Sequence, residues 1–404
     1  NNIGNPLFQE LYEADIKSIV TLSKDAFYIA ASEALFFLKI NNGHSVIRKF
    51  EDLNNLNLWS LEKGNEDDLW IGTYGNGLIH FNLKTLKREN IKFESPTFKT
   101  TAFNYIKALH LSNNGLLWIG FWGGGLASLN TKTNEYKIWI KNENQKNSLS
   151  FNDVWAMYED KFGRLWIGTN GGGLNLFVPN KNGEFLSWKY EEKNKNSLVN
   201  NSILTITEIP SSKENETALI IGTENGLSKV TVTNTSSKIY DVTLNFYNYL
   251  VNKSLGAILK DNNGYLWISG NTGLYRFNPK DNSSTNFSYS DGLFSNIFNA
   301  NSFAQSENGL MIFGSVKGPL IFNPNEIKLS DYQPNIILTD FKVFDTSIEP
   351  GENSPLKTNI PLAKEVILSY SDNVFSFQFS ALDYNSSESI QYAYIMEGFD
   401  KNWN

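Results

Sequence analysis

The chain of 404 residues has no cysteine, only three histidines and a deficit of positive charge. The absence of cysteine excludes disulfides, thiolate metal sites and a cysteine nucleophile, and three histidines leave few candidates for a metal centre or a histidine-dependent triad. Lys and Arg number 35 against 42 Asp and Glu, which gives a net charge of −7. Because neutralising phosphates requires a basic stripe, we expect no nucleic-acid-binding surface.

Long apolar runs are also missing, since no segment approaches the about 20 apolar residues that span a bilayer. Residues 1–6 contain neither a basic nor an apolar segment, so no signal peptide is predicted. The sequence begins without methionine and ends at Asn404 within a strand-like pattern, so we expect it to be part of a longer protein. A hydrophobic content of 41% excludes a wholly disordered chain.

Aromatic residues are abundant, at 14% with ten tryptophans, and several of them fall in a repeat. The repeated motif is Leu-Trp-Ile-Gly or a weaker version of it. Its copies lie at residues 27–30, 69–72, 117–120, 165–168, 219–222, 266–269 and 311–314, the first being degenerate. The leucines that follow successive copies are 43, 48, 48, 53, 47 and 46 residues apart, by subtraction of their positions. This spacing predicts seven repeats.

Each repeat contains short alternating segments separated by turn residues, as the fourth repeat illustrates. Residues 154–158, 164–169, 174–178 and 185–190 are predicted strands. Four antiparallel strands at this period describe a β-propeller blade. We therefore predict an all-β fold with a seven-bladed β-propeller over residues 1–335. The repeated Trp70, Trp118, Trp166 and Trp267 are expected to fill the space between neighbouring sheets.

The sequence changes character after Pro324, and residues 336–404 are predicted to form a second domain. Alternating segments at 336–344, 365–370, 374–381 and 391–396 predict further strands. They are too few for a complete sandwich of about 100 residues. We expect a truncated, immunoglobulin-like β-sandwich.

The order of these parts resembles a known family. The Leu-Trp-Ile-Gly-Thr units with their glycine-rich turns look like regulator-propeller repeats of bacterial hybrid two-component regulators. Residues 263–279 resemble the penultimate blade of their membrane-proximal propeller, and residues 291–324 resemble its closing blade. Residues 377–403 are similar to the N-terminal part of the tyrosine-rich sandwich domain that follows that propeller.

The resemblance implies a periplasmic sensor region of an inner-membrane protein, without catalytic activity or a cofactor of its own. It implies detection of an oligosaccharide and transmission through the sandwich to a membrane helix and an intracellular histidine kinase or transcription output. A homodimer is expected, because kinase output requires two chains. The chain differs from the family in having one propeller where two are usual, a degenerate first blade and an incomplete sandwich.

The glycine-rich turns 75–77, 123–125 and 171–173 lead us to a candidate binding face. In a propeller these turns share a face with the crossovers between blades, and aromatic rings flanked by asparagine amides suit a sugar. The candidate ligand-binding residues are Tyr74, Asn76, Phe121, Trp122, Asn152, Asp153, Asn170, Asn201 and Glu224. The alternative is that the asparagines are only turn formers and that Trp122 covers the channel.

No catalytic or metal-binding residues are predicted. The acidic pairs at 67–68, 159–160 and 191–192 fall in turns, where solvated charge is their ordinary role. Residues 260–267 echo the aspartate box of sialidases, which is itself a turn device. A lyase or glycosidase would need Arg164, Arg276 and Glu224 to converge. The other alternative is a propeller scaffold whose face docks a protein partner.

Overall fold

The computed structural model describes residues 11–41, 44–65, 67–96, 98–179, 183–211, 213–235, 240–327, 335–382, 392–401 and 404. The chain divides into two compact units, residues 1–327 and 328–404. We call them the propeller unit and the C-terminal unit. The sequence places the boundary after residue 335, and residues 328–334 between the two positions lie outside the described ones.

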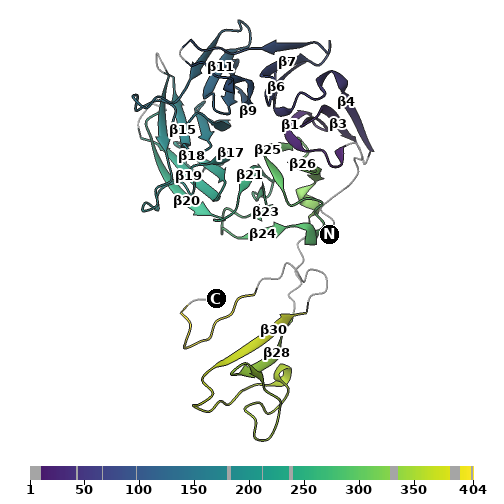
Figure 1. Ribbon diagram of the computed structural model, residues 1–404, viewed down its shortest axis with the longest axis vertical. Helices are drawn as coiled ribbons and strands as arrows, with labels where there is room; N and C mark the ends of the chain where they lie inside the picture. The colour runs from purple at the N-terminus through teal and green to yellow at the C-terminus, as the bar shows by residue number, and fades with distance from the viewer. Residues whose placement is uncertain are drawn as a thin grey trace. The chain divides into compact units, whose positions relative to one another are not determined.

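Within the described residues, the propeller unit consists of seven antiparallel sheets arranged around a centre (Figure 1). The first three are β1 (Ile16–Ser23), β2 (Ala26–Ala31), β3 (Leu35–Asn41) and β4 (His44–Phe50); β5 (Leu58–Lys63), β6 (Asp68–Thr73), β7 (Leu78–Asn82) and β8 (Arg88–Ile91); and β9 (Ile106–Leu111), β10 (Leu116–Phe121), β11 (Leu126–Asn130) and β12 (Tyr136–Trp139). Short 3-10 helices η2 (Glu51–Leu53) and η3 (Ala102–Asn104) lie in the crossovers before β5 and β9.

The remaining four sheets repeat this order. They are β13 (Val154–Glu159), β14 (Leu165–Thr169), β15 (Gly173–Val178) and β16 (Glu184–Trp188); β17 (Ile203–Ile209), β18 (Glu216–Thr223), β19 (Gly226–Asn234) and β20 (Val242–Tyr249); β21 (Leu255–Lys260), β22 (Leu266–Gly270), β23 (Gly273–Phe277) and β24 (Ser284–Phe287); and β25 (Phe298–Gln305), β26 (Met311–Ser315) and β27 (Gly318–Phe322). Helices η4 (Tyr289–Asp291) and η5 (Pro324–Glu326) flank the last sheet. The predicted all-β fold is confirmed, and the number of sheets agrees with the predicted blade count.

The ring closes between the first and seventh sheets. The innermost strand of each sheet packs against the innermost strands of both neighbours, and β25 packs against β1. The Ser302 hydroxyl donates to the Ile16 carbonyl at 2.9 Å. The Glu13 N–H also donates to the Lys317 carbonyl at 3.1 Å beside β27. The inner edge of each of these strands has no ladder partner, but it is short and is protected by the neighbouring blades around the centre of the ring.

The first described residue, Leu11, lies against the third strand of the seventh sheet. A Cβ atom added to Gly318, the first residue of β27, would lie 2.7 Å from the Leu11 carbonyl oxygen. In the fourth sheet the corresponding Gly173 faces the carbonyl of Trp188, the last residue of the fourth strand. Leu11 therefore lies beside the third strand of the seventh sheet, at the position that the last residue of the fourth strand takes in the fourth sheet. Its side chain is completely buried.

The repeated tryptophans pack between sheets, as predicted. Trp166 shares an apolar cluster with Ile203 and Ile206 of the fifth sheet, and Trp267 shares one with Phe298 and Phe313 of the seventh. Glycine follows three of the four Trp-Ile pairs, at Gly72, Gly120 and Gly168, and lies at the same contact between sheets. At Gly168, for example, an added Cβ would lie 2.4 Å from a methyl carbon of Ile203. The repeat is therefore the core of the scaffold.

The C-terminal unit contains one three-stranded sheet in its described residues. Its order is β29 (Thr346–Ser347), β28 (Ile336–Val343) and β30 (Phe375–Ala381), and η6 (Ile360–Leu362) packs on it. Phe341, Val343, Leu356 and Ile360 form a small core. The strand prediction for 365–370 is wrong, because these residues run without ladder partners, and residues 392–396 are likewise not a strand. The immunoglobulin-like sandwich stays a prediction.

Candidate ligand-binding site at the centre of the ring

Each blade supplies one residue to a ring of equivalent positions on the predicted face. This residue is the first of the turn that follows the second strand of the blade. Its backbone N–H donates to the carbonyl of the residue that immediately precedes the innermost strand of the same blade. For Tyr74 the acceptor is Asn57 at 2.8 Å, and for Trp122 it is Tyr105 at 2.9 Å. The seven residues, which we call the rim positions, are Ser32, Tyr74, Trp122, Asn170, Glu224, Asn271 and Val316.

A second set of equivalent residues lies on the innermost strands, where the ladder to the second strand skips one residue. In β5, for example, Leu58 pairs with Thr73 and Ser60 with Gly72, so Trp59 has no ladder partner. Such a β-bulge redirects a side chain, here next to the turn that carries the rim position. The skipped residues, which we call the inner positions, are Lys17, Trp59, Lys107, Trp155, Leu204 and Gly256. In β25 the ladder skips residues 299–302.

The rim positions of the second and third blades, the inner position of the second blade and Tyr105, which precedes β9, form an aromatic cluster. We define it as Trp59, Tyr74, Tyr105 and Trp122. The rings of Trp59 and Trp122 stack with centroids 5.4 Å apart and planes at 28°. Tyr74 meets Trp59 edge-on at 4.6 Å and Tyr105 at 4.8 Å. Tyr74 and Trp122 are each 40% exposed despite these contacts. The cluster thus presents ring surface to solvent.

A pocket of about 430 Å³ opens on this cluster. It is lined by Ser32, Asn57, Leu58, Trp59, Tyr74 and Trp122. Ring faces beside a hydroxyl and an amide can hold a ligand with one apolar and one polar side, because the rings cover the apolar side and the polar groups meet its hydroxyls. We call this the mouth pocket.

Lys107 lies beneath this cluster, between two tryptophans of neighbouring inner strands. Its Nζ is 4.6 Å from the ring centroid of Trp59 and 5.5 Å from that of Trp155. Burial and, to a smaller extent, the positive charge of Lys17 lower the pKa of Lys107 to about 8, while Asp15 acts in the opposite direction. Lys17 itself is paired with Asp15 at 2.5 Å.

One hydrogen bond crosses the centre of the ring. The Asn301 side-chain amide, in the seventh blade, donates to the Trp155 carbonyl, in the fourth blade, at 2.7 Å. Asn301 has a backbone φ of +57°, a left-handed conformation that asparagine tolerates better than most residues. The residues that the β25 ladder skips therefore place the Asn301 side chain of the seventh blade at the centre of the ring.

The asparagines and the aspartate of the predicted site have mainly local roles. The side-chain oxygens of Asn152 and Asn201 accept backbone N–H groups of the preceding blade, from Lys141 and Tyr190, both at 2.7 Å. Asp153 accepts the Gly123 N–H, although burial, the larger effect, raises its pKa. These three side chains fasten crossovers, as the alternative interpretation holds.

The remaining predicted residues divide into rim and non-rim positions. Asn170 and Glu224 occupy rim positions in the fourth and fifth blades, and Asn76 lies in the turn after Tyr74 with its amide on the Leu56 carbonyl at 3.2 Å. The assignment of Phe121 is wrong. It pairs with Ile106 in the ladder, is completely buried and packs on Phe103, so its ring points into the core while the next residue, Trp122, points outward.

Sequence reasoning missed Trp59, Tyr105 and Lys107 as site residues. The sequence does contain a signal for the inner positions. Residues 59, 107 and 155 are 48 residues apart, and each follows an aliphatic residue at the start of an inner strand. Aligning these strands by their ladders, and not by the Leu-Trp-Ile-Gly motif, would have identified them.

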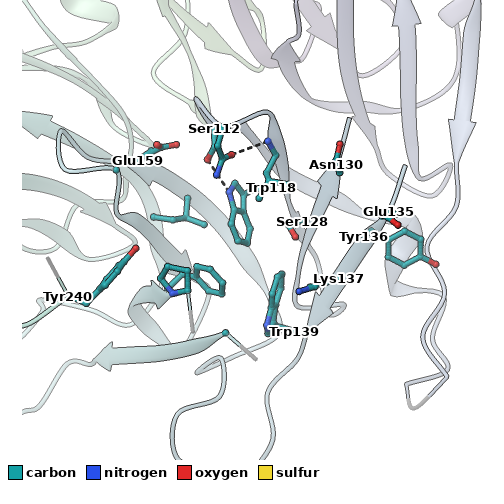
Figure 2. Close-up of a pocket in the computed structure, with 17 residues that line it drawn as sticks. Ser112, Trp118, Ser128, Asn130, Glu135, Tyr136, Lys137, Trp139, Glu159 and Tyr240 are labelled. Atoms are coloured by element: carbon teal, nitrogen blue, oxygen red, sulfur yellow. Dashed lines mark hydrogen bonds between the residues drawn. The ribbon is translucent and has the colours of Figure 1, made fainter. Parts of the chain in front are cut away.

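A separate pocket of about 770 Å³ lies between the third and fourth blades (Figure 2). Trp118, Trp139 and Phe177 form its apolar part, with ring centroids 4.9 to 5.6 Å apart. The Trp118 indole N–H donates to Ser112 Oγ at 3.0 Å. Here the rings contact one another and face the sheet interface. The pocket borders residues 180–182, outside the described ones, so we place the candidate site at the mouth pocket.

The turns that echo the aspartate box are structural. Asp160 accepts the indole N–H of Trp166 at 2.8 Å, the backbone N–H of Arg164 and the Arg164 guanidinium at 2.7 Å. Asp261 accepts the indole N–H of Trp267 at 3.0 Å. These carboxylates are buried, and neither of them lines the mouth pocket. They hold the first turn of the blade in shape.

The residues that a lyase or glycosidase would need are engaged at different places. Arg164 is completely buried and bonds Asp160, Thr217 and Asn234. Arg276 lies over the Tyr265 ring at 3.8 Å in the sixth blade, and Glu224 is an exposed rim residue. Among the described residues, no group of three or more histidines, aspartates or glutamates is arranged to hold a metal ion. In the same residues no helix has the length and apolar character to cross a membrane.

Comparison with known proteins supports the predicted resemblance. Residues 148–171 match the family model described as two component regulator propeller. A stretch of 152 residues is 34% identical to histidine kinase P4 of Formosa agariphila, covering 37% of this chain and 11% of that protein. The resemblance to regulator-propeller proteins is thereby confirmed.

Solved structures share the fold. The extracellular domain of a hybrid two component system from B. thetaiotaomicron aligns with a TM-score of 0.64 and 23% identity, over 97% of this chain and 50% of that one. Virginiamycin B lyase from Staphylococcus aureus aligns with a TM-score of 0.57 and 10% identity, over 77% and 95%. Identities this low show the fold alone. The chain spans half or less of the regulators that it matches.

Proposed function

We propose that this chain, which carries a regulator-propeller repeat, is the extracytoplasmic sensor region of a membrane-bound two-component regulator and binds a saccharide in the mouth pocket. The observation that carries the proposal is the aromatic cluster, whose ring surface borders a pocket of about 430 Å³. Aromatic faces hold the apolar face of a pyranose, while Ser32 and Asn57 reach its hydroxyls. This role is non-catalytic and uses no cofactor.

The wider proposal concerns signalling. The sensor lies in the periplasm, acts as a homodimer and passes its signal through the C-terminal unit to a membrane helix and an intracellular kinase or transcription output. A ligand shifts such an equilibrium only if it binds one arrangement of the protomers more tightly than the other. The kinase relative supports an output of this type.

The experiment is a thermal-shift and calorimetry screen of this chain against plant, algal and host oligosaccharides. A ligand that binds only the folded state raises the melting temperature with concentration. Trp122→Ala and Tyr74→Ala are expected to abolish binding. Tyr247→Ala is the matched control, because Tyr247 is 52% exposed on the outer strand β20. Light scattering with and without the bound saccharide measures the oligomeric state.

A small pocket favours a saccharide over a protein partner, because protein docking uses a broad surface. Equal loss of binding in Tyr247→Ala would show a general effect of removing aromatic surface. If no saccharide binds, the proposal fails for this chain and the protein-docking alternative becomes the leading one.

A further inference from the structure

Lys107 differs from the other charged residues near the centre of the ring in having no polar partner. Among the described residues its ammonium group contacts the rings of Trp59 and Trp155 and forms no hydrogen bond or ion pair. The nearest carboxylate that acts on it, Asp15, is already engaged. Its two oxygens meet Lys17 at 2.5 Å, Asn299 Nδ2 at 2.8 Å and Ser32 Oγ at 3.3 Å. The described residues therefore offer no acceptor to the N–H groups of Lys107, whose side chain is partly exposed.

A partly buried cation without a protein acceptor does not favour folding. Removing part of the water around an ammonium group is unfavourable, and two neighbouring rings recover only part of that energy. The lowered pKa of Lys107 reflects the same penalty. The equivalent inner position in the fifth blade holds Leu204, which shows that an apolar side chain fits the same backbone geometry. A requirement of folding does not explain a lysine here.

Lys107 is also connected to the mouth pocket. Trp59, whose ring it contacts, forms part of the pocket wall. Trp155, its other contact, has an indole N–H that is buried without a hydrogen-bond acceptor among the described residues. The centre of the ring thus holds two kinds of N–H donor, one of them cationic, beside a pocket with aromatic walls.

We infer that the ligand of the mouth pocket is an anionic saccharide, and that Lys107 pairs with its negatively charged group. This inference rests on the proposed function and adds the charge class of the ligand. A carboxylate or a sulfate ester supplies the acceptor that Lys107 lacks, and a charge-assisted hydrogen bond in a desolvated site is stronger than one on the surface. Cation–π contact with Trp59 and Trp155 holds the ammonium in place before the ligand arrives.

The test measures calorimetric affinity for pairs of saccharides that differ only in charge. Oligogalacturonides are compared with their neutral methyl esters, and sulfated galactan oligosaccharides with their desulfated forms, at fixed ionic strength. The two sets separate a carboxylate from a sulfate. We expect at least one anionic member to bind about 10- to 100-fold more tightly than its neutral counterpart, the range given by one hydrogen bond to a charged group.

The variants are Lys107→Met, which keeps the length of the side chain, and Lys107→Arg, which keeps the charge. Lys107→Met is expected to remove the preference for the anionic member over its neutral counterpart, whereas Lys107→Arg retains part of that preference. Lys137→Met, in the separate pocket between blades, is the matched control. Melting temperatures establish that each variant is folded.

The outcomes separate the two proposals. If saccharides bind through Trp122 but without a charge preference, or if Lys107→Met keeps the preference, the inference about Lys107 is wrong and the proposed function stands. If no saccharide binds, the proposed function fails for this chain and the inference about Lys107 fails with it.

Discussion

The blade turns and the centre of the ring use the same residue types in opposite ways. Beside the first turns of the fourth and sixth blades, Trp166 on β14 and Trp267 on β22 are completely buried, and each indole N–H is bonded to an aspartate of the turn. At the centre, Trp122 is 40% exposed, and Lys107 has no polar partner among the described residues. Positions where the blades agree form the scaffold. The rim and inner positions are geometrically equivalent from blade to blade but carry different side chains. Such positions can recognise a ligand.

The largest expected effect tests the scaffold side of this comparison. Asp160→Ala leaves the buried Arg164 guanidinium and the Trp166 indole without an acceptor, and we expect a loss of about 3–5 kcal/mol in the free energy of unfolding. In the third blade Ser112 takes the place of the aspartate beside Trp118, and Ser112→Ala is expected to lose about 1 kcal/mol. Urea denaturation measures both. Equal losses would contradict the role assigned to the buried ion pair.

Lys107→Met tests the centre of the ring, and here we expect the free energy of unfolding to increase. We expect the variant to be more stable than the wild type by about 1 kcal/mol at pH 7, because it removes a partly buried cation that has no acceptor among the described residues. The pKa of Lys107 is about 8 in the folded protein and 10.5 ordinarily. Between these values the unfolded chain binds more protons, so wild-type stability rises with pH. The difference between variant and wild type should shrink over that interval, as followed by denaturation at several pH values.

Glu62 offers an intermediate case, since it is largely buried in β5 but accepts the Leu111 N–H at 3.1 Å. Burial raises its pKa to about 7, while this hydrogen bond acts in the opposite direction. The folded state then binds more protons than the unfolded one between about pH 4.5 and 7, so wild-type stability falls as pH rises through that interval. Glu62→Gln keeps an acceptor for the Leu111 N–H. It should remove this pH dependence of stability and increase the free energy of unfolding by about 1–2 kcal/mol at pH 8. An unchanged curve would contradict the assignment.

The smallest expected effect on stability comes from Trp122→Ala. The side chain is exposed enough that its loss should change the free energy of unfolding by about 1 kcal/mol, against about 3–5 kcal/mol for Trp166→Ala in the core. Saccharide binding should follow the reverse order, being lost in Trp122→Ala. A large destabilisation by Trp122→Ala would mean that the residue is part of the scaffold after all.

The sequence predicts the propeller well because the repeated Leu-Trp-Ile-Gly segments are the scaffold, and a core built seven times leaves a periodic record. It predicts the face of the site for a related reason, because the turns that hold Tyr74 and Trp122 follow each motif directly. The rest depends on geometry that alternation does not record. Phe121 and Trp122 are adjacent aromatics, and only the ladder with Ile106 shows which of them points inward.

The inner positions were hidden for the same reason. A β-bulge inserts one residue into a strand, so the side chains of Trp59 and Lys107 break the period of two on which strand prediction relies. In the C-terminal unit, residues 365–370 alternate between apolar and polar side chains as a strand does, but they have no partner in the described sheet. An alternating pattern alone therefore does not establish a strand.

The contact between Leu11 and Gly318 has a mechanical consequence. The described chain begins at Leu11 and leaves the last sheet after Phe322, and both places contact the seventh blade. Tension applied at these two points is therefore applied across that one sheet, and the other six blades lie outside the direct path of the force. Leu11 lies beside Gly318, one strand spacing of about 5 Å away, and Phe322 lies four residues further along β27, about 13 Å.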